Sequence, residues 1–169
     1  LQSPSMSVQV KLISNDKNEF LVDVAIARMS DTIAGILDII PEDDIGKHPI
    51  PLNNVDAVVL KRVLEWCKQH RDDPVDTKEE IYDGREIDLS VPEWDKQFLQ
   101  LTEDIQKPFM ELMKAANFLH IPGLLHNCSK VVASRILNKS ADEIREYFHV
   151  ENDYTEAEIK KIREDQAWH

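Results

Sequence analysis

The feature that most constrains the fold is an acidic stretch at residues 72–93, which separates two parts of different character. It contains nine carboxylates against two basic residues, Lys78 and Arg85, and few apolar side chains. The carboxylates are Asp72, Asp73, Asp76, Glu79, Glu80, Asp83, Glu86, Asp88 and Glu93. A segment with so little apolar surface cannot offset the entropy cost of ordering. We therefore predict a mobile linker over 72–93, and it is the best candidate for a domain boundary.

The part before this linker mixes strand and helix patterns. Apolar residues alternate with polar ones over 8–13 and again over 20–24, with turn-forming residues at 15–18, which predicts a β-hairpin. Residues 25–40 have apolar side chains at helical spacing and predict one helix, or two with Ser30 as the cap between them. Ile50 and Leu52 between prolines predict a short edge strand. Residues 56–71 predict a helix that Asn53 or Asn54 caps.

The part after the linker is predicted to be entirely helical. Its helices are expected at 94–99, 108–119, 124–137, 141–148 and 156–167, with Pro122 and Gly123 breaking the chain before the third. Ser140 to Glu143 and Thr155 to Glu158 have the spacing of capping boxes. The two parts together predict an α+β fold.

Length and charge limit the classes of protein. The chain has 169 residues and a formal net charge of −12, which is enough chain for one domain, or for a small domain with an extension. Its acidity argues against a nucleic-acid partner or an anionic membrane surface. No apolar run approaches the ~20 residues of a membrane span, and no signal peptide opens the chain. Residues 1–6 are interpreted as a cloning scar plus the start methionine, Met6.

Catalytic and metal-binding patterns are missing from the sequence. The four glycines form no phosphate-binding array, and no known nucleophile or zinc-protease motif occurs. Cys67 and His70 could supply two metal ligands, but a second pair at matching spacing is absent. Cys128 could be paired with His120 or His126 as nucleophile and base, although a small core residue is the favoured interpretation. We expect no enzyme activity, metal or cofactor, and two reduced thiols in a cytoplasmic and nuclear protein.

The last two predicted helices leave an open question. They are short, charged and carry an apolar stripe, and short helices are marginal unless they pack on something. Either they fold back on residues 94–137, or another chain completes their stripe. Trp168, next to the end of the sequence, favours the second interpretation, because a terminal aromatic is most useful as a contact anchor.

The order of several short motifs closely resembles that of the Skp-type adaptors of SCF (Skp–cullin–F-box) ubiquitin ligases, over about residues 8–168. The motifs are L-K-R-V-L-E-W-C at 60–67, H-R-D-D-P at 70–74, W-D and F-L at 94–99, A-A-N-F-L at 115–119, G-L-L at 123–125, K-V-V-A at 130–133, E-I-R at 143–145, N-D-Y-T at 152–155 and Trp168. The A-A-N-F-L stretch, the N-D-Y-T entry and the terminal tryptophan in one order make this a specific set.

The resemblance implies a BTB/POZ domain, a small sheet with packed helices, at residues 7–71 and 94–137, followed by F-box-binding helices at 138–169. It implies an adaptor that binds the N-terminal domain of a cullin and F-box proteins, with a weak homodimer through the BTB part when unbound. Asn117 and Phe118 fall where the family contacts cullin. The residues that fall on the F-box region are Phe109, Met110, Leu125, Val132, Ile136, Ile144, Phe148, Val150, Ile159, Ile162 and Trp168.

The sequence also departs from this family. Phe118 stands where the family usually has tyrosine, so a hydroxyl hydrogen bond to cullin would be lost. About three extra residues lie between Phe98 and Ala115, so no roles are carried over to residues 101–107. Two rivals remain: a self-associating BTB scaffold, and an elongin C-like adaptor, which would end near the 120s of this numbering.

Overall fold

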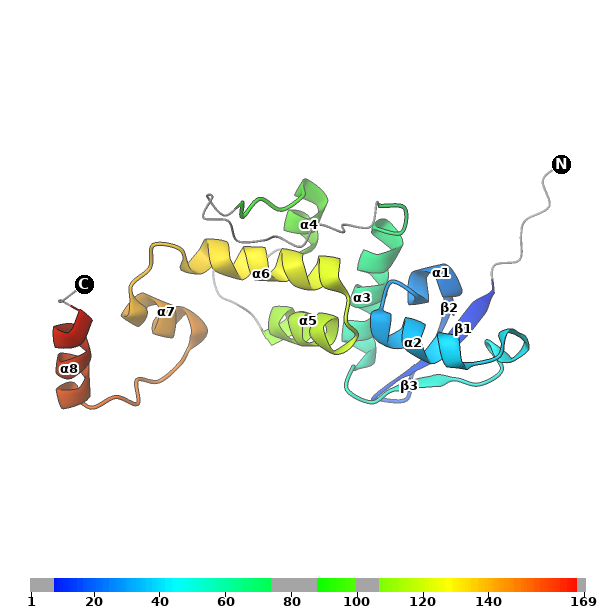
Figure 1. Cartoon of the computed structure of the whole chain (residues 1–169), viewed down its shortest axis with the longest axis horizontal. Helices are drawn as coiled ribbons and strands as arrows, with labels where there is room; N and C mark the ends of the chain where they lie inside the picture. The colour runs from blue at the N-terminus through cyan, green and yellow to red at the C-terminus, as the bar shows by residue number, and fades with distance from the viewer. Residues whose placement is uncertain (1–7, 74–87, 100–106, 167–169) are drawn as a thin grey trace.

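The computed structural model describes residues 8–73, 88–99 and 107–166 of the chain (Figure 1). It is an α+β fold with one small sheet and packed helices, as the sequence predicts. The elements are β1 (Gln9–Ser14), β2 (Glu19–Asp23), α1 (Val24–Ala27), α2 (Asp31–Ile39), a 3₁₀ turn η1 (Glu42–Asp44), β3 (Ile50–Leu52), α3 (Ala57–Gln69), α4 (Glu93–Phe98), α5 (Lys107–Phe118), α6 (Pro122–Ile136), α7 (Ala141–Phe148) and α8 (Glu156–Gln166).

The sheet has three strands in the order β2-β1-β3. β1 pairs antiparallel with β2, with Val10 opposite Val22, and parallel with β3, with Leu12 opposite Ile50. These four side chains are buried, whereas Leu21 on the other face is 68% exposed. Because side chains alternate between the two faces of a strand, one face of the sheet meets the helices and the other meets water. The predicted hairpin and edge strand are both confirmed.

One hydrophobic core joins the parts of the chain on either side of the acidic stretch. It runs from Val10 in β1 through α3 to Cys128 in α6, and Leu60 of α3 and Leu112 of α5 are fully buried within it. Figure 1 shows α3 crossing next to α5 and α6, with α1 and α2 between these helices and the sheet. The acidic stretch therefore does not separate two independent cores.

The acidic stretch is described only at its ends. Residues 74–87, the greater part of the predicted linker, lie outside the described residues. Val91 is buried, and α4 begins at Glu93. The C-terminal end of the predicted linker is thus part of the folded unit, because Val91 packs as an apolar side chain.

The start of α3 differs from the prediction. Its N-cap is Asp56, not Asn53 or Asn54, and the Asp56 side chain makes no capping hydrogen bond. Asp16 in the hairpin turn does so instead, because its Oδ1 accepts from the backbone N–H of Ala57 at 2.9 Å. Hydrogen bonding, first from the Ser14 hydroxyl, holds the pKa of Asp16 below its ordinary value. The tertiary fold supplies a cap that no local pattern indicates.

The start of α6 also differs. Pro122 and Gly123 were predicted to precede the helix, but Pro122 is its first residue. Proline suits this position because the N–H it lacks would have no partner in the first turn of a helix. Gly123 follows within the helix, and a Cβ added to it would lie 2.9 Å from Cη2 of Trp66. The glycine therefore serves close packing between α6 and α3.

The last two helices extend beyond the far end of α6, and α8 lies farthest from the sheet (Figure 1). Both begin where the sequence predicts, but α7 contains no buried residue. Val150 and Tyr154, in the connection to α8, are 58% and 49% exposed. Ile144, Tyr147 and Phe148 of α7 are nevertheless half-buried, so α7 is partly covered by neighbouring residues, and the fold-back of these helices on residues 94–137 stays a prediction. Across those residues, no helix has the length and apolar character needed to span a membrane.

Candidate protein-interaction surfaces

The first candidate surface is the C-terminal end of α5. Ala115 and Ala116 are buried against the core, while Asn117 is exposed and Phe118 is 38% exposed. An aromatic ring that remains this exposed at the end of a buried helix is a candidate contact residue. The structure thus brings the two predicted cullin-binding residues together on the surface.

The first turn of α2 holds this end of α5 in place. The Thr32 hydroxyl donates to the carbonyl oxygen of Phe118 at 3.1 Å, and the Ser30 hydroxyl donates to that of Leu119. The backbone N–H of Asp31 donates to the carbonyl oxygen of His120 at 3.1 Å. A helix start has spare N–H groups and a helix end has spare carbonyls, so each satisfies the other here. The position of Phe118 is consequently fixed from two elements.

His120 completes this helix end. Its φ is +49°, in the left-handed region, and the N–H of Ile121 donates to the carbonyl oxygen of Ala116 at 2.9 Å. This is the hydrogen bond of a Schellman closure, in which glycine is the usual residue at the left-handed position. His120 also lies 3.4 Å from the Asp31 carboxylate. The sequence did not indicate this closure, because histidine is an uncommon residue at a left-handed position. It also did not indicate that Ser30 and Thr32 donate to the end of α5.

The second candidate surface follows α6 into α7 and α8, and the predicted F-box residues differ along it. Met110, Leu125 and Val132 are half-buried and pack against the core. Farther out, none of the apolar side chains is fully buried. These are Ile136, Ile144, Phe148 and Ile159, which are half-buried, and Val150 and Ile162, which are exposed.

Two predicted members of this surface need separate treatment. Phe109 is only 3% exposed and belongs to the core, because the first turn of α5 directs its ring inward. In this conformation Phe109 is therefore a core residue and not, as predicted, part of the contact surface. Trp168 lies outside the described residues.

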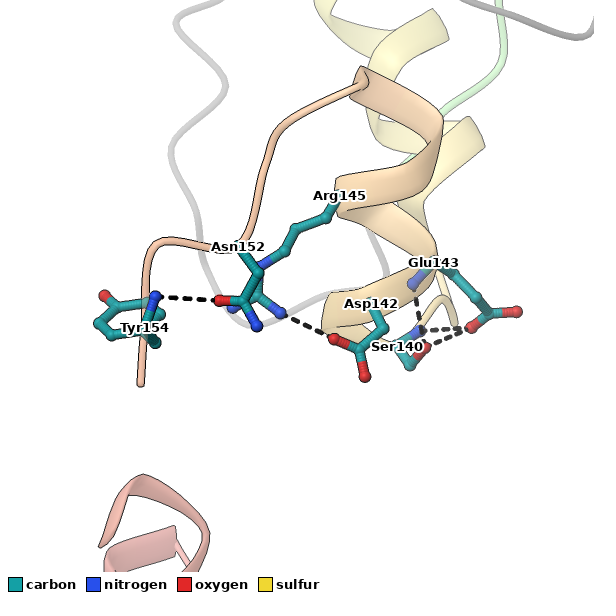
Figure 2. Close-up of polar contacts among 6 residues, drawn as sticks. All are labelled: Ser140, Asp142, Glu143, Arg145, Asn152 and Tyr154. Atoms are coloured by element: carbon teal, nitrogen blue, oxygen red, sulfur yellow. Dashed lines mark hydrogen bonds and ion pairs between the residues drawn. The ribbon is translucent and has the colours of Figure 1, made fainter. Parts of the chain in front are cut away.

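Contacts close in sequence determine the shape of α7. The Ser140 hydroxyl and Glu143 form the predicted capping box, and the Ser140 N–H donates to the Glu143 carboxylate at 2.7 Å (Figure 2). Arg145 binds Asp142 at 2.8 Å and lies over the ring of Tyr154, 6.0 Å from its centroid. The N–H of Tyr154 in turn donates to the Asn152 side chain at 3.2 Å. These contacts all lie within residues 140–154 and shape the segment locally.

The carboxylates that cap α7 and α8 both have a pKa below the ordinary value of glutamate. Hydrogen bonds from the Ser140 backbone and side chain hold the pKa of Glu143 below its ordinary value. Hydrogen bonds from the side chain and backbone of Thr155 do the same to the pKa of Glu158. Both helix starts therefore need an ionised carboxylate, which also suits the positive end of the helix dipole.

The two thiols are unsuited to nucleophilic chemistry. Cys67 and Cys128 are free and buried, and burial raises the pKa of each to about 12. Because the thiolate is the reactive form, both side chains act as small apolar residues, as favoured for Cys128 from the sequence. Within the described residues, no group of three or more histidine, cysteine or acidic side chains is placed to hold a metal ion.

Comparisons with known proteins show the family. Residues 8–72 match the tetramerisation domain of the Skp1 family, and residues 122–169 match its dimerisation domain. A protein of Talaromyces stipitatus named E3 ubiquitin ligase complex SCF subunit sconC is 39% identical over 163 residues, covering 96% of this chain and 98% of that protein. A Skp1-related protein of Caenorhabditis elegans is 39% identical over 163 residues, which cover 95% of this chain and 90% of the relative.

A third relative comes from fission yeast. It is the Suppressor of kinetochore protein 1 of Schizosaccharomyces pombe, 38% identical over 161 residues, which cover 95% of this chain and 96% of that protein. Identity at this level over nearly the whole chain is shared with relatives from three organisms. The chain belongs to the Skp1 family, a family of SCF ubiquitin ligase adaptors, and its sheet and packed helices are the BTB-like POZ domain of that family.

Proposed function

We propose that this protein bridges a cullin to F-box substrate receptors within an SCF ubiquitin ligase and performs no chemistry itself. Its contribution is positional, because two interfaces on one chain determine where a bound substrate lies relative to the ubiquitin-carrying enzyme. Membership of a family with a relative named as an SCF subunit supports this role. Two buried thiols accord with the reducing cytoplasm and nucleus, which we propose as its location.

The separation of the two surfaces carries the proposal. The end of α5 lies immediately before α6 in the chain, whereas α7 and α8 follow the opposite end of α6 (Figure 1). With 15 residues, α6 spans about 22 Å at 1.5 Å per residue. Two partners can therefore occupy the protein at the same time, as a bridging function requires.

On the first surface, Asn117 and Phe118 are proposed to contact the N-terminal domain of a cullin. Phe118 contributes apolar area from a position fixed by α2, and fixed aromatic residues are the usual centres of protein interfaces. Because phenylalanine has no hydroxyl, this contact is apolar where the tyrosine typical of the family would also form a hydrogen bond. The difference favours a cullin whose facing residue needs no polar partner.

On the second surface, an F-box is proposed to cover the apolar side chains of α6, α7 and α8. Ile144 and Phe148 lie four residues apart on α7, so they share one face of the helix. Covering this face would bury the remaining apolar area of side chains that are only half-buried and would order both helices. Part of the binding free energy would then be offset by the entropy cost of ordering.

Self-association is the second candidate function, because the matched family domains are named for tetramerisation and dimerisation. In the free protein the exposed α7–α8 surface could bind a second copy. An F-box would then compete with the dimer, so the two functions differ in their response to that partner. An elongin C-like adaptor is disfavoured, because α6, α7 and α8 continue beyond residue 122.

Reconstitution tests the bridging function. The full chain is mixed with a cullin N-terminal domain and an F-box domain, and complexes are measured by size-exclusion chromatography with light scattering. We expect a ternary complex. Asn117→Ala with Phe118→Ala should remove only cullin, and Ile144→Ala with Phe148→Ala should remove only the F-box.

Two outcomes would contradict the proposal. Equal loss of both partners with either double variant would show a single shared surface. A dimer that persists at saturating F-box concentration would support the self-associating scaffold instead.

A further inference from the structure

Neither candidate surface uses a buried polar cluster that joins the end of α3 to α4. Its central residue is Asp95 of α4, the one acidic side chain among the described residues that is buried, with 0% exposure. The indole N–H of Trp66 donates to its Oδ1 at 2.6 Å. A buried carboxylate is costly unless both of its oxygens are compensated. The second oxygen, Oδ2, has no hydrogen-bond partner among the described residues.

The group that faces this second oxygen is the imidazole of His70. Its Nε2 lies 3.3 Å from Oδ2 of Asp95 and is itself without a hydrogen-bond partner among the described residues. On the other side of the ring, Nδ1 lies 2.6 Å from Oδ2 of Asp73. One imidazole therefore lies between two carboxylate oxygens, one buried on α4 and one 60% exposed.

The contacts favour one tautomer of His70. A carboxylate can only accept, so the 2.6 Å contact with Asp73 is a hydrogen bond in the tautomer that carries its proton on Nδ1. A neutral imidazole then has a lone pair at Nε2, facing the oxygen of a buried carboxylate. Two lone pairs at 3.3 Å in a buried site repel each other, so a second proton is needed between Nε2 and Oδ2.

We propose that His70 and Asp95 share one bound proton that holds α4 against α3. This His70–Asp95 contact is named the clasp, and it opens as the pH rises. The proton belongs to His70 as imidazolium or to Asp95 as the carboxylic acid, and both forms remove the repulsion. When α4 separates, Asp95 enters water as a carboxylate and His70 as a neutral imidazole. The closed clasp thus binds one more proton than the open one.

Aromatic rings connect the clasp to the neighbouring helices. The His70 ring stacks on Trp66 with centroids 4.2 Å apart and meets the edge of Trp94 at 5.5 Å. Trp66 also packs against Gly123 at the start of α6. The clasp therefore fixes α4 next to α3 and α6, and it joins the two sides of the acidic stretch, since His70 lies just before residue 72 and Asp95 lies just after residue 93.

Four other charged or titratable groups on the neighbouring described elements have partners of their own or are neutral. On α3, Arg62 donates to the carbonyl oxygen of Phe98 at 3.0 Å and lies over that ring. After α3, Arg71 pairs with Asp72 at 3.8 Å. On α6, Cys128 is a neutral thiol, because burial raises its pKa to about 12. On α4, Lys96 pairs with Glu93 at 3.5 Å.

Hydrogen exchange of the full chain tests the clasp. Opening constants of the α4 amides are obtained between pH 6 and 8, after division by the intrinsic exchange rates, which themselves rise with pH. For one released proton the opening constant should rise about tenfold per pH unit once a solvated histidine is neutral, and it should level off where the closed clasp itself loses the proton, because only in this interval does the closed form bind more protons than the open form. An opening constant that does not change over this range would overturn the proposal.

Two matched variants separate the shared proton from mere packing. Asp95→Asn keeps an acceptor for Trp66 and can donate to a neutral Nε2, so α4 should remain closed but lose its pH dependence. Asp73→Asn still accepts from Nδ1 and should keep that dependence. If both variants retain the wild-type slope, the proton is bound elsewhere.

A measurement on the unmodified chain covers the case in which a variant fails to fold. At about pH 7.5, where a solvated histidine is mostly neutral, the ¹⁵N shifts of the His70 ring and the ¹³C shift of the Asp95 carboxyl report the two sites. A shift typical of imidazolium, or of a protonated carboxyl, supports the proposal. A neutral ring together with an ionised Asp95 would refute it.

Discussion

The helix pair α2 and α7 shows how this chain uses one kind of local structure for two purposes. Both are short, and both begin with a serine whose side chain caps the first turn. α2 buries Ile33 and Leu37 and is hydrogen-bonded to the end of α5, whereas α7 buries no residue. Capping determines where a helix begins, but burial determines whether it is attached to the fold. The attached helix supports one candidate surface, and the exposed helix is itself the other.

The largest effect should come from opening a cavity in the attached region. Leu112→Ala removes a side chain with 0% exposure from the centre of α5 and should lower the free energy of unfolding by about 2–5 kcal/mol. Val150→Ala, at a position 58% exposed, is the control and should change it by less than about 0.5 kcal/mol. Urea unfolding followed by circular dichroism measures both. Equal losses would mean that the C-terminal region is as much a part of the core as α5.

The next effect concerns binding at the supported surface. Phe118→Ala should weaken the binding of a cullin N-terminal domain by about 1–3 kcal/mol, because an aromatic side chain fixed by α2 is removed. F-box binding should stay unchanged, and calorimetric titration measures both affinities. Phe118→Tyr adds the hydroxyl typical of the family and shows whether the chosen cullin can use it. Equal loss of both partners would show that Phe118 acts through the fold instead of through contact.

A pair of glycines tests packing against helix propensity. Gly123→Ala places a Cβ 2.9 Å from Trp66 at a tight contact between α6 and α3, and should cost about 1–3 kcal/mol. Gly35→Ala in α2 meets no atom within 4 Å, and should stabilise the protein by roughly 0.5–1 kcal/mol through the backbone entropy of glycine. Thermal unfolding of both variants shows whether each substitution destabilises or stabilises the protein. Stabilisation by Gly123→Ala would refute the close contact between α6 and Trp66.

The smallest effect should be confined to α7. Its capping box needs an ionised Glu143, whose pKa is held below the ordinary value of 4.5 by hydrogen bonds from Ser140. A depressed pKa contributes stability above the ordinary value, and this is lost as the pH falls through the folded-state value. The ¹³Cα shifts of α7 should therefore move toward random-coil values below about pH 4.5, and Ser140→Ala should remove this dependence while α2 is unaffected. A matching change in α2 would indicate global acid unfolding.

Much of this arrangement could be predicted from the sequence, because it depends on local patterns. Alternation predicted the hairpin, proline placement predicted the edge strand at 50–52, and Ser140 and Glu143 predicted the start of α7. The failures involve partners distant in sequence. Asp16 caps α3 across 41 residues, and Thr32 reaches Phe118 across 86. No local pattern indicates such contacts.

The candidate surfaces show the same difference between residues that the sequence located and contacts that only the fold reveals. The family resemblance located Asn117 and Phe118, and the structure exposes both. The same resemblance included Phe109, which the helical phase of α5 buries. The cluster of Trp66, His70 and Asp95 was present in the quoted motifs, but only the fold reveals that the three side chains meet. Sequence spacing could not distinguish a buried charge pair from two solvated residues.

Hydrogen exchange of the full chain, measured free, with a cullin N-terminal domain and with an F-box domain, tests the two-surface account most directly. We predict fast exchange in α7 and α8 in the free chain, with protection there only when the F-box is bound. Cullin should protect only the end of α5 and the first turn of α2. Slow exchange of α7 and α8 in the free chain that does not change with the F-box, or protection of the same residues by both partners, would contradict it.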